Sequence, residues 1–258
     1  MRKNILLVIL TNNRPQKVYK LVEQYIADFD ILVSDSGKSI DETKLPEQVC
    51  ISRNNAKNGL ENLRIISQEI SRPAIFLHDD DQLRDHDRFI DSISGRDLII
   101  CSPKYRLKKK IRTFNELCEL YFTDPAGNCI LISGVYFRNP SRIDFEKNYK
   151  RAGKYGDFIL IAEWMKSEGF RLATEPYVNY IEHADNDNKI RNTKDRNGLA
   201  KFVGECDKTG NELFSNIVIG LKDYKMKNFI YDFVLRPRNL KYVVPLAQKA
   251  IRKINEKL

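Results

Sequence analysis

The chain has 258 residues, of which 42% are hydrophobic, so it can bury a core without disulfides or a structural metal. Its five cysteines are an odd number without a C-x-x-C pair, which argues against a secreted disulfide framework and favours a reducing cytoplasm. The net charge is +9, and residues 222–258 hold +7 of it, from ten Lys or Arg against three Asp or Glu. The apolar run at 5–10 is too short to span a bilayer and is expected to be a buried strand.

The first hundred residues alternate between two patterns. Short runs rich in Ile, Val and Leu predict strands covered on both faces at 4–10, 30–34, 49–52, 74–78 and 97–102. Apolar residues at helical spacing predict helices at 18–26 and 60–70. Strands that alternate with helices are typical of an α/β fold, so we predict a Rossmann-like, mostly parallel sheet flanked by helices.

The pattern changes after residue 100. We expect a helix at 113–122, a longer strand at 129–138, an amphipathic helix at 155–169 and a strand at 171–182. Residues 243–258 form a basic amphipathic pattern, which can lie on an anionic membrane or pack its apolar stripe against the body. We therefore predict a catalytic domain over 1–190 and a helical, basic C-terminal region over 191–258.

The strongest chemical signal is His78-Asp79-Asp80-Asp81, directly after the strand at 74–77. Adjacent carboxylates repel one another unless a cation offsets them, and Mg²⁺ and Mn²⁺ prefer such oxygen ligands. Ligands of open α/β sheets bind beyond the carboxyl ends of the strands, where this turn lies. The alternative is an acidic turn that caps the next helix near Arg84.

Six short motifs follow one another along the chain. They are Thr11-Asn12-Asn13-Arg14, Asp35-Ser36-Gly37, Asn55-Ala56-Lys57-Asn58-Gly59 with Asn62, Asp79-Asp80-Asp81, Gly156-Asp157-Phe158, and Tyr180-Ile181-Glu182-His183-Ala184-Asp185-Asn186. Their order resembles that of the motifs in the GT-A-fold glycosyltransferases, in particular the inverting family 2. The last resembles a Y-x-x-H-x-x-N element, and the Asp79 segment resembles a D-x-D metal motif. The resemblance covers roughly residues 4–190 and implies a GT-A fold.

The resemblance implies a role for each matching residue. The nucleotide-binding residues would be Thr11, Arg14, Asp35, Asn58, Asn62, Asp79 and Asp80. Asp81, Asp79 and His183 would address a Mn²⁺ or Mg²⁺ ion, with Asp81 as the favoured direct ligand.

Asp157 would be the general base that takes the proton from the acceptor hydroxyl. The chain has Gly156 where the family often has Glu, so Glu163 and Glu168 remain rival bases. Asp157 can also be read as a cap on the helix that follows it.

Several of these residues have an ordinary structural reading as well. Asp35 can cap a turn at Gly37, Asn58 and Asn62 can be polar residues at a helix entry, and His183 can be structural. The segment from Thr11 to Arg14 precedes Pro15 and is also a natural turn and helix start.

The implied activity is transfer of a sugar, with inversion, from a nucleotide-sugar donor to a glycan or lipid-linked acceptor in bacterial surface polysaccharide synthesis. One alternative is a nucleotidyltransferase, which would need a Gly-rich loop after the first strand, whereas residues 11–15 contain no Gly. Another is a non-catalytic module that binds anionic glycan or membrane.

Two basic segments bear on partners. Lys104–Arg112 has six cations and no acid, and it either contacts an anionic partner near the acceptor or is a solvated loop. The basic tail would place a cytoplasmic enzyme at the inner face of the membrane. The loop lacks interleaved aromatics, so nucleic acid is not an expected partner.

Overall fold

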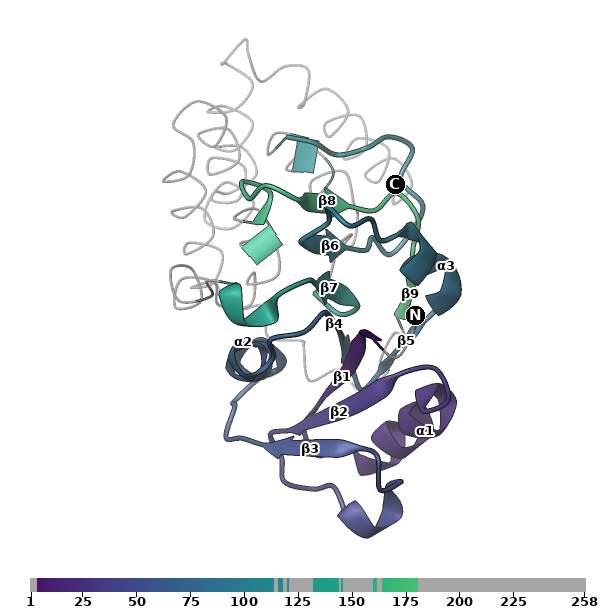
Figure 1. The fold of residues 1–258 in the computed structure, drawn as a ribbon, viewed down its shortest axis with the longest axis vertical. Coiled ribbons are helices and arrows are strands. Elements are labelled where there is room, and N and C mark those ends of the chain that lie inside the picture. Colours follow the sequence, from purple (N-terminus) through teal and green to yellow (C-terminus); the bar gives the residue numbers. More distant parts are fainter. Residues whose placement is uncertain are drawn as a thin grey trace, which may run out of the picture. The chain divides into compact units, whose positions relative to one another are not determined.

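The computed structural model describes residues 4–113, 116–117, 120, 132–143, 145, 160–161 and 164–180 (Figure 1). The chain divides into two units, Met1–Asp187 and Asn188–Leu258, and all the described residues belong to the first. The predicted boundary at residue 190 and the predicted helical tail lie outside the described residues. Within the described part, no helix is long and apolar enough to cross a membrane.

Four parallel strands form the first half of a seven-stranded sheet. They are β1 (Leu6–Thr11), β2 (Asp30–Asp35), β3 (Cys50–Arg53) and β4 (Ala74–His78). β1 pairs in parallel with both β2 and β4, and β2 pairs in parallel with β3. Each strand lies within two residues of its predicted bounds at either end.

Helices α1 (Pro15–Tyr25) and α2 (Gly59–Glu69) lie on opposite faces of this sheet (Figure 1). Pro15 stands in the first turn of α1, where its missing N–H costs nothing. Successive strand residues point to opposite faces, so Leu7 and Ile9 of β1 join the core cluster that contains Val18 of α1. Both faces are therefore buried, which explains the continuous apolar runs of the strands.

In the strand order β3-β2-β1-β4, the side on which successive strands are added changes at β1, while all four strands stay parallel. The chain moves outward from β1 to β3 and then returns to place β4 on the other side of β1. The carboxyl ends of β1 and β4 therefore meet at a topological switch point, where open α/β sheets bind their ligands.

The other half of the sheet contains β7 (Val135–Phe137), β6 (Ile99–Cys101) and β8 (Phe170–Leu172), in that order from β4. β7 runs antiparallel to both β4 and β6, whereas β6 and β8 are parallel to each other. Only β7 opposes the common direction, so the prediction of an α/β fold with a mostly parallel sheet is confirmed.

The strand predicted over 129–138 is shorter than expected among its described residues. Residues 132–134 form a bend and a turn, and β7 begins only at Val135. Gly134 has φ +77°, and a Cβ there would collide with the side chain of Val178. The turn depends on a glycine at this point, and it brings the antiparallel strand alongside β4.

A second, two-stranded sheet pairs β5 (Asp81–Leu83) with β9 (Val178–Tyr180) in antiparallel fashion. The strand predicted over 171–182 is therefore two strands, β8 and β9, which belong to different sheets. Pro176 lies between them and cannot donate a ladder hydrogen bond, so the break has a local cause.

Shorter helices complete the described part: η2 (Glu42–Lys44), α3 (His86–Ser92) and η3 (Pro140–Arg142). Asp85 caps α3 by accepting a hydrogen bond from the Arg88 N–H, 3.0 Å away. The acidic turn at 79–81 therefore does not serve as this cap. Of the helices predicted at 113–122 and 155–169, residues 116, 117, 120, 160, 161 and 164 are described and helical. Residues 165–169 are turns and a bend, so the second helix ends earlier than predicted.

Candidate metal and nucleotide site

Asp79 lies at the centre of the contacts between the ends of β1 and β4. The Thr11 hydroxyl donates to Asp79 Oδ2 across 2.5 Å, and Arg14 Nη1 donates to Asp79 Oδ1 across 3.2 Å. The Asp79 N–H donates to the Leu10 carbonyl at 3.0 Å. The Asp79 side chain is only 5% exposed. Its hydrogen bonds to Thr11, Arg14 and Leu10 join the turn after β4 to the end of β1.

Burial raises the pKa of the Asp79 carboxyl, while the Thr11 hydrogen bond and the Arg14 charge act in the opposite direction. For Arg14, burial lowers the pKa of the guanidinium, but its hydrogen bond to Asp80 and the two neighbouring carboxylates raise the pKa above the ordinary value. Arg14 places one positive charge beside the two carboxylates of Asp79 and Asp80, so part of their negative charge would remain available to a second cation.

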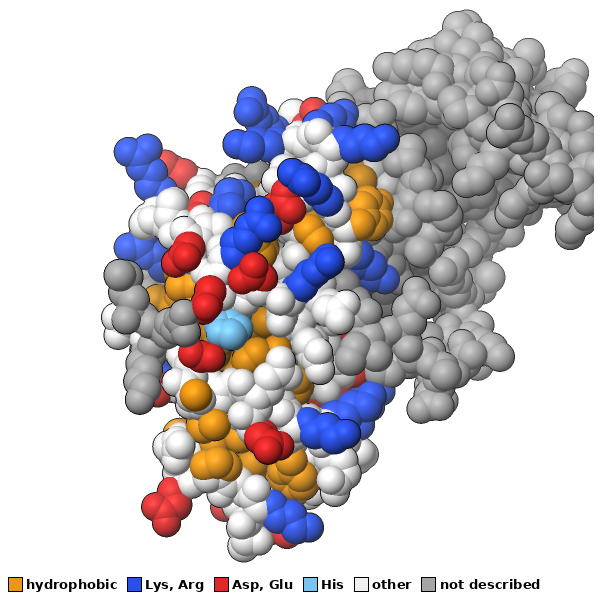
Figure 2. Space-filling model, turned by 90° about the vertical axis from the view of Figure 1, so that its right-hand side faces the viewer, with side chains coloured by type: hydrophobic (Ala, Val, Ile, Leu, Met, Phe, Trp, Pro, Cys, Tyr) orange, Lys and Arg blue, Asp and Glu red, His pale blue; other side chains and the backbone are white. Residues whose placement is uncertain are grey.

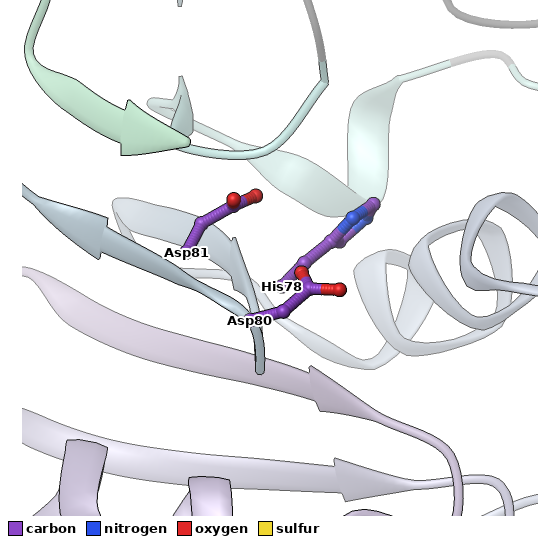
Figure 3. A group of neighbouring side chains, drawn as sticks. All are labelled: His78, Asp80 and Asp81. Atoms are coloured by element: carbon purple, nitrogen blue, oxygen red, sulfur yellow. The ribbon is translucent and has the colours of Figure 1, made fainter. Parts of the chain in front are cut away.

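His78, Asp80 and Asp81 form the candidate metal group (Figure 3). Each offers one ligand atom, and these atoms lie within 4.8 Å of one another. His78 ends β4 and Asp81 begins β5, so the fold itself brings the group together. Asp81 is 6% exposed.

The donor set suits a divalent cation. Carboxylates are the ligands that Mg²⁺ and Mn²⁺ prefer, and an imidazole is a nitrogen ligand that suits transition metals in general. The residues present therefore fit the predicted ion.

The predicted ligands are distributed differently from the expectation. Asp81 belongs to the group, but both oxygens of Asp79 are engaged by Thr11 and Arg14. Asp80, predicted to contact the nucleotide, lies in the metal group, so the geometry favours Asp80 over Asp79 as a ligand. His78 was missed, although its place next to the acids was visible in the sequence. His183 lies outside the described residues.

Asp35 has no exposed surface, and it orders the loop after β2. Its Oδ1 accepts from the Gly37 N–H at 3.1 Å and its Oδ2 from the Ile40 N–H at 2.9 Å. A Cβ on Gly37 would collide with Asn13, so this loop packs tightly against the turn after β1. The turn-capping interpretation describes what Asp35 does here, and nucleotide contact remains a prediction.

Asn62 of α2 is 1% exposed and links α2 to the strand ends. Its amide donates to the Ser34 carbonyl at 3.0 Å and to the Thr11 carbonyl at 3.4 Å. Its Oδ1 accepts from the Ser34 hydroxyl at 2.6 Å and from Asn54 Nδ2 at 2.8 Å. Ser34 and Asn54 were not among the predicted site residues, although Asn54 directly follows β3, at the end of a strand where ligand-binding residues are expected.

Asn58 caps α2. Its Oδ1 accepts from the Glu61 N–H at 2.8 Å, and Glu61 Oε2 accepts in turn from the Lys57 N–H at 2.7 Å. This satisfies two backbone donors at the helix entry. A nucleotide contact of Asn58 or Asn62 stays a prediction.

Two of the three candidate bases, Asp157 and Glu163, lie outside the described residues. The third, Glu168, is exposed and immediately precedes Gly169, whose carbonyl accepts from the Leu98 N–H at 2.9 Å. Both β6 and β8 begin just after these residues, so Glu168 lies at the amino ends of the parallel strands. The acidic turn lies at the carboxyl ends of the strands, on the opposite edge of the sheet from Glu168. Glu168 is therefore too far from this turn to act as the base there.

No protein-family model matches the chain, and no curated protein matches it. Among solved structures, HddC from Yersinia pseudotuberculosis is 16% identical, with a TM-score of 0.39 over 67% of this chain and 92% of that one. A structure described as a glucose-1-phosphate thymidylyltransferase from Bacillus anthracis, in complex with sucrose, is 10% identical. Its TM-score is 0.38, over 67% of this chain and 88% of that one. These are distant likenesses, and the function proposed below rests on the residues of this chain.

Proposed function

We propose that this chain is a metal-dependent transferase that uses a sugar nucleotide and, more specifically, an inverting glycosyltransferase. The observation that carries the proposal is the acidic turn at the switch point. Asp80 and Asp81 are grouped there with His78, while Asp79 joins the turn to Thr11 and Arg14. An acidic group at the carboxyl ends of parallel strands, with Asp81 buried and Asp80 partly exposed, is suited to a metal–diphosphate complex.

In this proposal, His78, Asp80 and Asp81 hold the Mn²⁺ or Mg²⁺ ion. When bound, such an ion neutralises negative charge on a diphosphate leaving group. Arg14, close to the same carboxylates, supplies a second positive charge beside the diphosphate. Thr11 and Asn62 tie the ends of β1, β2 and β4 together through hydrogen bonds, so the donor would meet residues that are already ordered.

The transfer itself needs a base, and we assign it to Asp157. Its carboxylate takes the proton of the acceptor hydroxyl while that oxygen forms a bond to the anomeric carbon. The bond between the anomeric carbon and the diphosphate oxygen breaks, and its electron pair leaves with the diphosphate. Attack from the opposite side inverts the anomeric centre.

In this proposal His183 also addresses the metal, as the resemblance implies. It follows three positions after Tyr180 in the sequence, and Tyr180 pairs directly with Asp81.

Calorimetry of UDP, GDP and dTDP, with and without Mn²⁺, tests the proposal on the intact protein and on Asp81→Asn. We expect metal-dependent binding of one nucleotide and at least a tenfold loss in the variant, or ~1.4 kcal/mol. Asp91→Asn is the matched control, because Asp91 is an exposed acid on α3. Equal binding by the two variants would contradict the metal assignment.

A nucleotidyltransferase on a similar α/β fold remains the second candidate for sugar-nucleotide chemistry. It would consume a nucleoside triphosphate and a sugar 1-phosphate and release pyrophosphate. The glycosyltransferase would instead release a nucleoside diphosphate from a sugar nucleotide. Assaying both products separates the two activities. If neither is released and Asp81→Asn retains its binding partners, the chain is instead a non-catalytic glycan- or membrane-binding module.

The cellular setting is part of the same proposal. We place the enzyme in the bacterial cytoplasm, in surface polysaccharide synthesis, with a glycan or lipid-linked acceptor and its basic tail on the inner membrane face. Vesicles of phosphatidylglycerol and phosphatidylcholine, with the full chain and a chain without residues 239–258, test the tail. Equal binding by both chains would remove the anchor.

A further inference from the structure

The basic loop, residues Lys104–Arg112, leaves the end of β6 and is described throughout. Its six cations are Lys104, Arg106, Lys108, Lys109, Lys110 and Arg112, with no acid among them. The side chains from Lys108 to Lys110 are exposed. Figure 2 shows Lys and Arg side chains gathered toward the upper end of the face that is drawn.

The loop lies at the same edge of the sheet as the acidic turn. β6 and β4 are each antiparallel to β7, which lies between them, so their carboxyl ends point the same way. Neighbouring strands are ~4.8 Å apart and β6 ends about two residues short of the level of His78, so the two strand ends are about 12 Å apart. The basic loop, which follows β6, and the candidate metal group, which follows β4, therefore begin close together at the same edge of the sheet.

Apolar contacts and hydrogen bonds brace the loop. Leu107 and Ile111 are buried, and the Leu107 N–H donates to the Thr174 carbonyl at 2.8 Å. Arg106 Nε lies 2.9 Å from Glu175 Oε1. These contacts hold the backbone of the basic loop in place, so its cations have a defined position.

The segment that braces the loop also leads to Asp81. The Tyr177 N–H donates to the Ser102 hydroxyl at 2.8 Å, at the root of the loop. Tyr177 precedes β9, and β9 pairs with β5, in which Asp81 is the first residue. One short stretch of chain therefore supports the basic loop at one end and the metal group at the other.

We propose that the basic loop binds a phosphate group carried by the acceptor substrate; the assignment of this group to the acceptor rests on the glycosyl transfer proposed above. The acidic turn needs a cation before it can accept a phosphate, whereas the loop attracts phosphate directly. Tyr105, 43% exposed within the loop, adds a ring that is apolar on its face and polar at its tip. Such a surface fits a phosphate joined to an apolar chain.

The test measures lysine acetylation by mass spectrometry on the full chain without metal, so that phosphate has no bound ion to join. The probes are inorganic pyrophosphate, vesicles of phosphatidylglycerol with phosphatidylcholine, and vesicles of phosphatidylcholine alone. We expect pyrophosphate or the anionic vesicles to slow acetylation of Lys108, Lys109 and Lys110 severalfold relative to Lys20 and Lys44. Protection by pyrophosphate identifies phosphate itself as the ligand; protection by anionic vesicles alone identifies a lipid headgroup.

A paired variant makes the result quantitative. Lys108→Gln with Lys110→Gln should weaken binding of the protective probe about thirtyfold, since each of the two cations near an anionic surface contributes ~1 kcal/mol. Lys20→Gln with Lys44→Gln removes the same charge from α1 and η2 and should change binding less than twofold. Equal protection of all five lysines, or equal effects of the two variants, would overturn the proposal.

Calorimetry with Mn²⁺ and the nucleotide bound by the intact protein separates this proposal from the activity on which it rests. The loop variant should bind the nucleotide as the intact protein does. If no probe protects the loop lysines of the intact protein, but that protein binds the nucleotide, only the proposal for the basic loop is refuted. Loop protection in a chain that binds no nucleotide would refute the assignment to an acceptor, and with it the proposed transfer.

Discussion

Arg14 Nη1 lies 2.5 Å from Asp80 Oδ2, so the guanidinium neutralises a carboxylate that also belongs to the candidate metal group. The same nitrogen lies 3.2 Å from Asp79 Oδ1. If a divalent cation binds as proposed, Arg14 would therefore compete with it for Asp80 when no nucleotide is bound. A diphosphate would relieve this competition, because it gives Arg14 another anion to contact.

Arg14→Gln should strengthen the binding of Mn²⁺ alone and weaken the binding of the Mn²⁺–nucleotide pair. The Arg14 side chain is 45% exposed, so the first effect should be about two- to fivefold, the range of an exposed ion pair. Calorimetric titrations of Mn²⁺ with and without nucleotide measure both effects. Arg14→Lys keeps the charge and should leave the affinity for Mn²⁺ alone near its original value. If Mn²⁺ alone binds more weakly to Arg14→Gln, the competition does not exist.

Thr11→Val should destabilise the fold by about 1–3 kcal/mol, because it removes the hydroxyl that donates to a buried carboxylate. Valine keeps the shape of the side chain, so the loss reports the hydrogen bond. The free energy of unfolding from urea titration is the measurement. Thr11→Ser retains the hydroxyl and should lose less than half as much, and equal losses would mean that packing dominates at this position.

Asn62→Leu should cost more than Asn58→Ala. The first leaves several buried partners unsatisfied and should lower the free energy of unfolding by about 2–4 kcal/mol, whereas loss of a helix cap costs ~1 kcal/mol. Nucleotide titration of the folded variants then separates structure from binding. A variant that keeps its stability but loses nucleotide affinity would establish the ligand contact implied by the family resemblance.

Tyr25→Phe should weaken the attachment of α1 to β5. The Tyr25 hydroxyl accepts from the Leu83 N–H at 2.9 Å and donates to the Leu83 carbonyl at 3.3 Å. Its loss should cost about 1–3 kcal/mol in urea unfolding at neutral pH, because two buried backbone groups lose a partner.

The same substitution should change the response to alkaline pH. Burial raises the pKa of Tyr25 above its ordinary 10.0, so the folded chain keeps a proton that the unfolded chain loses. Stability from this group is complete below pH ~10 and falls as the pH rises through the raised pKa. The decline should therefore be shallower in Tyr25→Phe, and equal slopes in the two proteins would show that Tyr25 does not contribute to it.

The sheet was predictable from the sequence where burial on both faces leaves a simple signal. β1 and β4 are continuous apolar runs, and they were predicted within two residues. β5 was missed because Asp81-Gln82-Leu83 is short and mostly polar, and its pairing with β9 is visible only in three dimensions. Pro176 could have divided the strand predicted at 171–182, since proline interrupts a ladder.

The site was predictable in its location and less so in its internal contacts. Parallel topology places the ends of β1 and β4 together, and Thr11 and the acidic turn, both predicted to bind the nucleotide, meet there. Which of three adjacent carboxylates faces Arg14, and which faces His78, depends on side-chain conformations that motif spacing does not fix. Asn62 was likewise predicted as a site residue, but its hydrogen bonds were not, because they involve Ser34, a strand residue that belongs to no motif.

The pairing of β5 with β9 also has a consequence for the order in which the protein matures. Contacts among β1, β2 and β4 involve residues that are all synthesised within the first third of the chain. Asp81 obtains its strand partner Tyr180 only about a hundred positions later. Such distant pairing forms late, because closing a long loop costs chain entropy. A nascent chain can thus pair β1, β2 and β4 before β9 has been synthesised, whereas β5 obtains its strand partner only after Tyr180 has been added.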